Sequence, residues 1–125
     1  HDTKFGDTHA KFGLRPTWGM SQTLSQAVGI RLAKEMSYSA RIILGDEAVR
    51  VGLANRAEKN KEDLDSLVNK ISSQISSNSK EAVTAFKDLY NLAQSGLGLD
   101  EALKAELDRE YPEIKDTNER LSEFK

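Results

Sequence analysis

The stretch FGDTHAKFGLRPTWGMSQTL, residues 5–24, holds three of the eight glycines, one of the two prolines, the only tryptophan and one of the two histidines. So many glycines together with a proline exclude a single helix or strand over this stretch and predict a shaped loop. The apolar residues Met20, Leu24 and Ala27 then recur at helical spacing, which predicts that the loop runs into a helix. Free backbone N–H groups at a helix start suit an anionic or oxyanionic ligand.

The elements around this loop are short in the first half of the chain and longer afterwards. We expect the end of a strand at 3–5, helices at 21–28 and 30–38 separated by Gly29, an extended segment at 40–44 and a helix at 47–51 capped by Asp46. From residue 60 onward a long helix is expected, because one apolar face is formed by Leu64, Leu67, Val68, Ile71 and Ile75. Further helices are expected after the capping residues Ser79, Asp100 and Asp116, the last of them reaching Phe124.

These elements predict a mainly α-helical chain with short β segments. The length of 125 residues fits one domain, and the sequence contains no repeat and no linker. We divide it into residues 1–57, with the loop, two short helices and a short strand, and residues 58–125, a helical segment. The abrupt start on a structured loop suggests a piece of a longer polypeptide. The apolar helix faces suggest burial against missing polypeptide or another subunit.

The composition argues against several classes of partner. The net charge is −2 and acids and bases are interspersed, so there is no basic stripe to bind nucleic acid. No apolar run is long enough for a membrane span. The chain has no cysteine, which excludes disulfides and thiolate chemistry and fits a reducing compartment. With His1 and His9 as the only histidines we predict no metal site, and we expect a cytoplasmic protein.

Four blocks of sequence occur in an order that resembles a known family. They are residues 5–24, 26–29 with 33–36, 47–48 with 52–55 and, more weakly, 99–103 followed by Glu106 and 116–124. The order resembles the second half of the crotonase family, the enoyl-CoA hydratases and isomerases. The resemblance implies the C-terminal part of a crotonase-like α/β spiral core, followed by a helical oligomerisation tail that forms trimers or hexamers. It also implies an acyl-CoA thioester as substrate and no separate cofactor.

The resemblance places one catalytic position within the chain. Hydratases of this family hold the thioester oxygen in an oxyanion hole of two backbone N–H groups and use two glutamates on the attacking water. The oxyanion glycines and the first glutamate would precede His1. The second glutamate belongs to a Pro-Glu pair that here reads Thr8-His9, so histidine stands where the carboxylate is expected. An imidazole can act as acid or base near neutral pH, whereas the alternative is a histidine hydrogen-bonded in a turn.

A second motif concerns substrate binding. The family's Pro-Gly-x-Gly loop corresponds to residues 16–19, which implies substrate-binding positions at Thr17, Trp18 and Gly19. Trp18 then forms a wall of the acyl pocket, or else packs into the core or a subunit contact. Asp7 beside His9 forms either a dyad with it or a solvated or capping carboxylate.

Three functions remain open at this point. The first is a portion of an enoyl-CoA hydratase/isomerase-family protein acting on acyl-CoA thioesters. The second is a non-catalytic oligomerisation or interaction fragment, and we expect the isolated chain to be inactive because the oxyanion donors and first glutamate are missing. The third, an unrelated helical binding domain that matches by chance, is disfavoured by the number of blocks in the right order.

Overall fold

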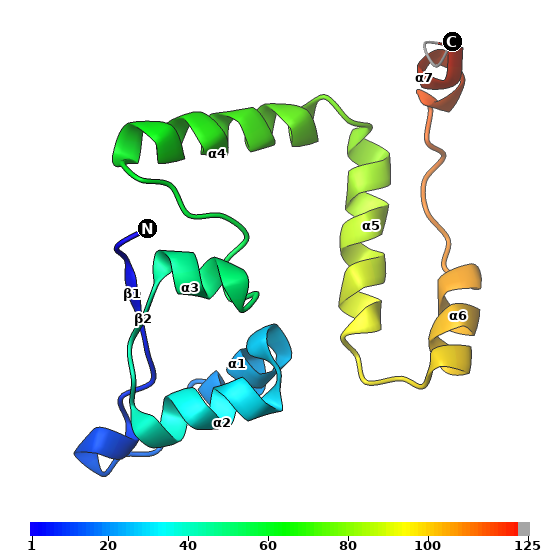
Figure 1. The fold of residues 1–125 in the computed structure, drawn as a ribbon. Coiled ribbons are helices and arrows are strands. Elements are labelled where there is room, and N and C mark those ends of the chain that lie inside the picture. The colour runs from blue at the N-terminus through cyan, green and yellow to red at the C-terminus, as the bar shows by residue number, and fades with distance from the viewer. Residues whose placement is uncertain (123–125) are drawn as a thin grey trace. The chain divides into compact units, whose positions relative to one another are not determined.

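The computed structural model describes residues 1–122, so Phe124, the expected end of the last helix, lies outside the described residues. The chain separates into two compact units, His1–Leu67 and Val68–Lys125. Figure 1 shows short elements in the first part of the chain, then the two longest helices, α4 and α5, and after them the shorter α6 and α7. The division of the chain into residues 1–57 and 58–125 stays a prediction.

The first unit combines a minimal sheet with three helices. Strand β1 (Lys4–Phe5) pairs antiparallel with β2 (Ile43–Leu44), with Phe5 opposite Ile43. Between them lie the 3₁₀ turn η1 (Ala10–Phe12) and the helices α1 (Met20–Val28) and α2 (Ile30–Ser39), which pack on each other. Gly29 has a φ of 77° and ends α1, as its place between two apolar runs predicts. Helix α3 (Gly45–Arg50) follows β2 directly.

A small apolar core holds this unit together. Its buried members come from α1, α2, β2 and α3, and they are Leu24, Ala33, Met36, Ile43 and Ala48. Phe5, Met20 and Leu53 are among the partly buried residues packed around them. Because Ala33 and Met36 lie at i and i+3, they put one face of α2 against the core. This anchoring of α2 determines where its remaining side chains lie.

We expect Ile43→Val to lower the free energy of unfolding by about 0.5–1.5 kcal/mol. The side chain of Ile43 is only 1% exposed, so removing one methyl group leaves a void in the core. Chemical denaturation of the two proteins measures the change. Ile42→Val is the matched control, since the neighbouring Ile42 is 47% exposed and should change stability by less than about 0.5 kcal/mol. Equal effects at the two positions would contradict this assignment of the core.

Helix α4 (Lys61–Ser76) begins in the first unit and continues into the second. The described part of the second unit then holds α5 (Lys80–Ala93), α6 (Leu99–Leu107) and α7 (Thr117–Ser122), joined by non-helical segments, and α5 contacts α6. None of these four helices contains a buried residue in the part of the chain that is described. Large apolar side chains lie exposed along them, including Val68, Ile75, Phe86, Tyr90 and Leu107. Among the described residues, no helix has the length and apolarity needed to span a membrane.

The structure confirms the mainly helical class with short strands but corrects the helix starts. Leu44 and Gly98 occupy the N-cap positions of α3 and α6, so Asp46 and Asp100 fall inside the first turns. There they still interact favourably with the helix dipole. Ser79 does take the N-cap position of α5, but its Oγ donates to Oδ1 of Asp116 at 2.7 Å instead of capping the helix.

Candidate functional site

An open cleft of about 500 Å³ lies in the first unit. It is bordered by the loop after β1 and by helices α1 and α2. Apolar side chains such as Leu14, Leu24 and Ile30 supply much of the lining, and the polar groups include Asp7 and His9. A largely apolar cleft with a few convergent polar groups is typical of a small-molecule site.

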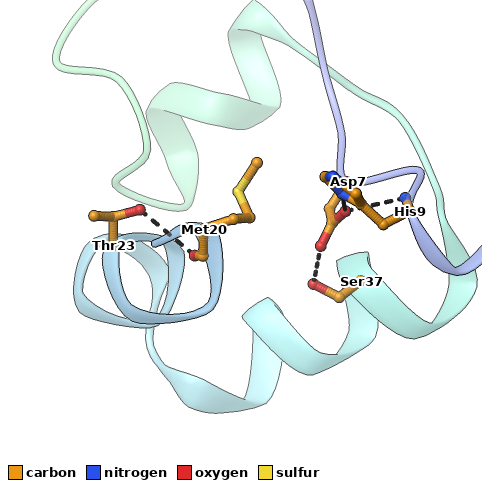
Figure 2. Close-up of polar contacts among 5 residues, drawn as sticks. All are labelled: Asp7, His9, Met20, Thr23 and Ser37. Carbon is orange, nitrogen blue, oxygen red and sulfur yellow. Dashed lines mark hydrogen bonds and ion pairs between the residues drawn. The ribbon is translucent and has the colours of Figure 1, made fainter. Parts of the chain in front are cut away.

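Two polar residues of the cleft, His9 and Ser37, converge on one buried carboxylate, that of Asp7. Asp7 is only 3% exposed. Its Oδ1 accepts hydrogen bonds from the backbone N–H of His9 at 3.2 Å and from the Nδ1 of His9 at 2.6 Å. Its Oδ2 accepts a hydrogen bond from the Oγ of Ser37 at 2.7 Å. Figure 2 shows Asp7 between His9 on its own loop and Ser37 on α2.

These contacts keep the Asp7 carboxyl ionised. Burial raises the pKa of Asp7, but the hydrogen bonds from His9 and Ser37 outweigh burial and hold the pKa below its ordinary value. An ionised carboxylate can only accept hydrogen bonds, so the proton of a neutral His9 is assigned to Nδ1. The Nε2 atom then carries the free lone pair and can accept a proton.

The loop geometry around His9 follows from a tight turn. The carbonyl of His9 accepts the N–H groups of Phe12 and Leu14, and Gly13 closes the turn with a φ of 66°. The turn η1 contacts α2. The side chain of His9 remains 26% exposed and lines the cleft. His9 is therefore held in a turn by its backbone while its ring stays accessible.

The structure brings His9 and Trp18 together, but the predicted substrate-binding residues Thr17, Trp18 and Gly19 all lie outside the cleft lining. The rings of His9 and Trp18 meet edge to face, with centroids 6.4 Å apart. Trp18 is 90% exposed, and Thr17 is also exposed. Gly19 occupies the N-cap position of α1 with a φ of 76°, a conformation that suits glycine. Pro16, from the same loop, does line the cleft.

Sequence reasoning missed Ser37, which approaches Asp7 from thirty residues away. A signal for it exists in the pattern of α2. Ser37 lies four residues after the buried Ala33, so it is a polar residue on the inward face of an amphipathic helix. The cationic residues Arg15 and Lys34 also line the cleft and were not singled out. Among residues 1–122, no group of three or more histidine, aspartate or glutamate side chains could hold a metal ion.

Comparison with known proteins decides the family. Residues 1–124 match the family model described as enoyl-CoA hydratase/isomerase. The chain belongs to the enoyl-CoA hydratase/isomerase family. This family member carries part of a crotonase fold, as the resemblance of the four blocks predicts.

Related proteins are considerably longer than this family member. It is 36% identical over 110 residues to a probable peroxisomal enoyl-CoA hydratase 1 of Arabidopsis thaliana, covering 86% of this chain and 40% of that protein. It is 34% identical over 90 residues to a short-chain-enoyl-CoA hydratase of Clostridium acetobutylicum, covering 72% of this chain and 34% of the other. This family member therefore spans well under half the length of these relatives.

Solved structures show the same fold. An enoyl-CoA hydratase from Mycobacterium smegmatis superimposes with a TM-score of 0.66 at 36% identity, over 82% of this chain and 48% of the other. An enoyl-CoA hydratase from Mycobacterium marinum reaches a TM-score of 0.76 over 85% of this chain and 41% of the other. At 23% identity the second likeness concerns the fold alone.

Proposed function

We propose that this family member acts on the double bond or α-carbon of an acyl-CoA thioester, as part of a longer protein, with His9 as an acid–base group. The observation that carries the proposal is the 2.6 Å contact between Nδ1 of His9 and the buried carboxylate of Asp7. A carboxylate that orients a histidine and stabilises its protonated form is a recurring device of acid–base catalysis. The cleft position of His9 supports the same role.

The chemistry that fits this arrangement is hydration of an enoyl thioester. Nε2 of His9 takes a proton from the attacking water, whose oxygen bonds to C3 of the double bond. The electron pair of the C2=C3 bond forms a C1=C2 bond and the carbonyl pair moves onto the thioester oxygen, which gives an enolate. The oxygen pair then re-forms the carbonyl, and the C1=C2 pair takes a proton from the imidazolium at C2. The product is the 3-hydroxyacyl thioester, and His9 returns to its neutral form. Asp7 stabilises the imidazolium between the two proton transfers.

Substrate binding is proposed for the loop that precedes α1. Thr17, Trp18 and Gly19 form the segment that leads into the start of this helix, where backbone N–H groups favour an anionic or oxyanionic group. The edge-to-face contact of Trp18 with His9 supports a role as a wall beside the acyl group. The positive charges of Arg15 and Lys34 at the cleft suit the phosphates of coenzyme A. Coenzyme A enters as part of the substrate, and no separate cofactor is proposed.

Assembly is the proposed role of the helical segment. We assign the active-site side to residues 1–57 and the assembly of a homotrimer or hexamer to residues 58–125. The exposed apolar side chains of α4 to α6 support this division, because such faces are stable in water only when other polypeptide covers them. The absence of cysteine supports a reducing compartment, and we propose the cytoplasm.

The alternative, an interaction fragment without turnover, is proposed for the chain in isolation. This alternative is favoured because the chain covers only 40% and 34% of the length of two of its hydratase relatives. Hydration of crotonyl-CoA, followed by the loss of enoyl-thioester absorbance, tests both statements on the complete protein that contains this chain and on the 125 residues alone. We expect turnover from the first and none from the second. An inactive complete protein would contradict the proposed activity, and turnover by the isolated chain would contradict the fragment proposal.

A further inference from the structure

We propose that Ser37 on α2 is a positioning residue that fixes the Asp7 carboxylate and, through it, selects the Nδ1-protonated tautomer of His9. The inference concerns how the site is held together. Its catalytic consequence rests on the function proposed above for His9. The tautomer itself can be measured whether or not His9 takes part in catalysis.

The first step is that both oxygens of the buried Asp7 carboxylate have hydrogen-bond partners. Oδ1 of Asp7 is used by the backbone N–H and the ring of His9, and Oδ2 is used by the hydroxyl of Ser37. Because Asp7 is 3% exposed, water has little access to replace a lost partner. The two oxygens are therefore held from two sides, by the loop and by the helix (Figure 2). Rotation of the carboxylate would break both sets of bonds.

The second step is that the helix provides the fixed side. Ser37 follows Met36, which is 1% exposed, and lies one helical turn after Ala33, which is 6% exposed. These two core residues fix the position and rotation of α2. His9, by contrast, sits in a short turn and is partly exposed. Because Ser37 is fixed by the packed core, its hydrogen bond holds the carboxylate of the loop residue Asp7 in a defined position.

The third step concerns the proton of the imidazole. A neutral histidine carries its proton on either nitrogen, and the tautomer is set by the partner of each. A carboxylate held in place at Nδ1 favours the proton there and leaves the lone pair on Nε2. Without the hydroxyl of Ser37, Oδ2 of Asp7 loses its partner and the carboxylate is held only from the side of the loop. We expect the Nδ1 contact to loosen and the Nε2-protonated tautomer to become populated. That tautomer cannot accept a proton at Nε2.

The test compares Ser37→Ala with Ser39→Ala in the complete protein. Ser39 is a matched control, because it lies on the same helix and its hydroxyl bonds to the carbonyl of Glu35 and the N–H of Arg41 instead of Asp7. Nitrogen NMR of histidine-labelled protein reports the tautomer, and His9→Gln assigns the signal. We expect Ser37→Ala to convert a single Nδ1-protonated form into a mixture. We also expect kcat to fall about tenfold with KM changed by less than about twofold, while Ser39→Ala leaves both unchanged.

A second pair of variants separates the hydroxyl from packing. Threonine and valine have nearly the same shape, but only threonine carries a hydroxyl. Ser37→Thr should therefore keep the wild-type tautomer and kcat, whereas Ser37→Val should lose both. This pair also serves if Ser37→Ala does not fold. An unchanged His9 tautomer in both Ser37→Ala and Ser37→Val would overturn the inference. A shifted tautomer with unchanged kcat would support the positioning role and overturn the acid–base role proposed for His9.

Discussion

We expect replacement of His9 by alanine to lower the kcat of the complete protein on crotonyl-CoA by about 10²–10⁴-fold, the usual contribution of a positioned acid–base group. The substitution removes the imidazole that accepts and returns a proton at Nε2 in the proposed mechanism, while the apolar lining of the cleft is left intact. KM should change much less, because the imidazole acts on the reacting atoms and not on the bulk of coenzyme A. Steady-state hydration kinetics measure both constants.

Two further variants define what is lost. His9→Glu places a carboxylate at the position where the family carries one, and we expect it to retain more activity than His9→Ala. Lys11→Ala is the control, since Lys11 lies exposed in the same turn and is absent from the cleft lining. If neither substitution of His9 alters turnover, His9 is a structural histidine and the proposed mechanism fails.

Asp7→Asn produces the second large effect, on both activity and stability. The amide nitrogen cannot accept a hydrogen bond, so either the N–H groups of His9 lose their acceptor or the hydroxyl of Ser37 has to turn from donor to acceptor. We expect kcat to fall by about 10²-fold or more, because His9 loses the carboxylate that sets its tautomer. The free energy of unfolding should fall by about 1–3 kcal/mol near neutral pH. Hydration kinetics and chemical denaturation measure the two effects.

The stability effect of this substitution depends on pH with a defined sign. The pKa of Asp7 is lower in the folded protein than its ordinary value of 3.8, so its stabilising contribution is present above that value. The contribution is lost as the pH falls through the folded pKa. The difference in unfolding free energy between wild type and Asp7→Asn should therefore shrink below about pH 4. Asp2→Asn is the control, since Asp2 is 90% exposed, and a pH-independent difference for Asp7→Asn would contradict the assignment.

Local pattern accounts for most of what could be predicted about the fold. The spacing of Met20, Leu24 and Ala27 and the interruption at Gly29 predict α1 and the break before α2, since both are properties of neighbouring residues. The caps were less predictable. Several polar residues near a helix start have similar preferences for the N-cap position. Contacts with residues far away in the sequence can determine whether such a side chain caps the helix. Ser79 illustrates this, because its hydroxyl is taken by Asp116 from thirty-seven residues away.

In the candidate site too, contacts between residues close in the sequence could be predicted, whereas contacts set by helix packing could not. The resemblance singled out His9, and its neighbour Asp7 lies on the same loop, so their contact was open to prediction as a dyad. Ser37 was not, because its contact with Asp7 depends on how α2 packs against the loop. The apolar faces of α4 and α5 were also predicted, yet these helices contain no buried residue among those described. A sequence pattern shows that a face requires cover but does not identify the covering polypeptide.

The most direct test of the proposed site is a crystal structure of the complete protein with an unreactive saturated acyl-CoA, such as butyryl-CoA. The proposal requires the acyl group to enter the cleft bordered by α1 and α2. Nε2 of His9 should then lie within about 3–4 Å of C2 or C3, or reach them through one ordered water. An acyl group bound elsewhere, with the Asp7–His9 pair facing bulk solvent, would contradict the proposal.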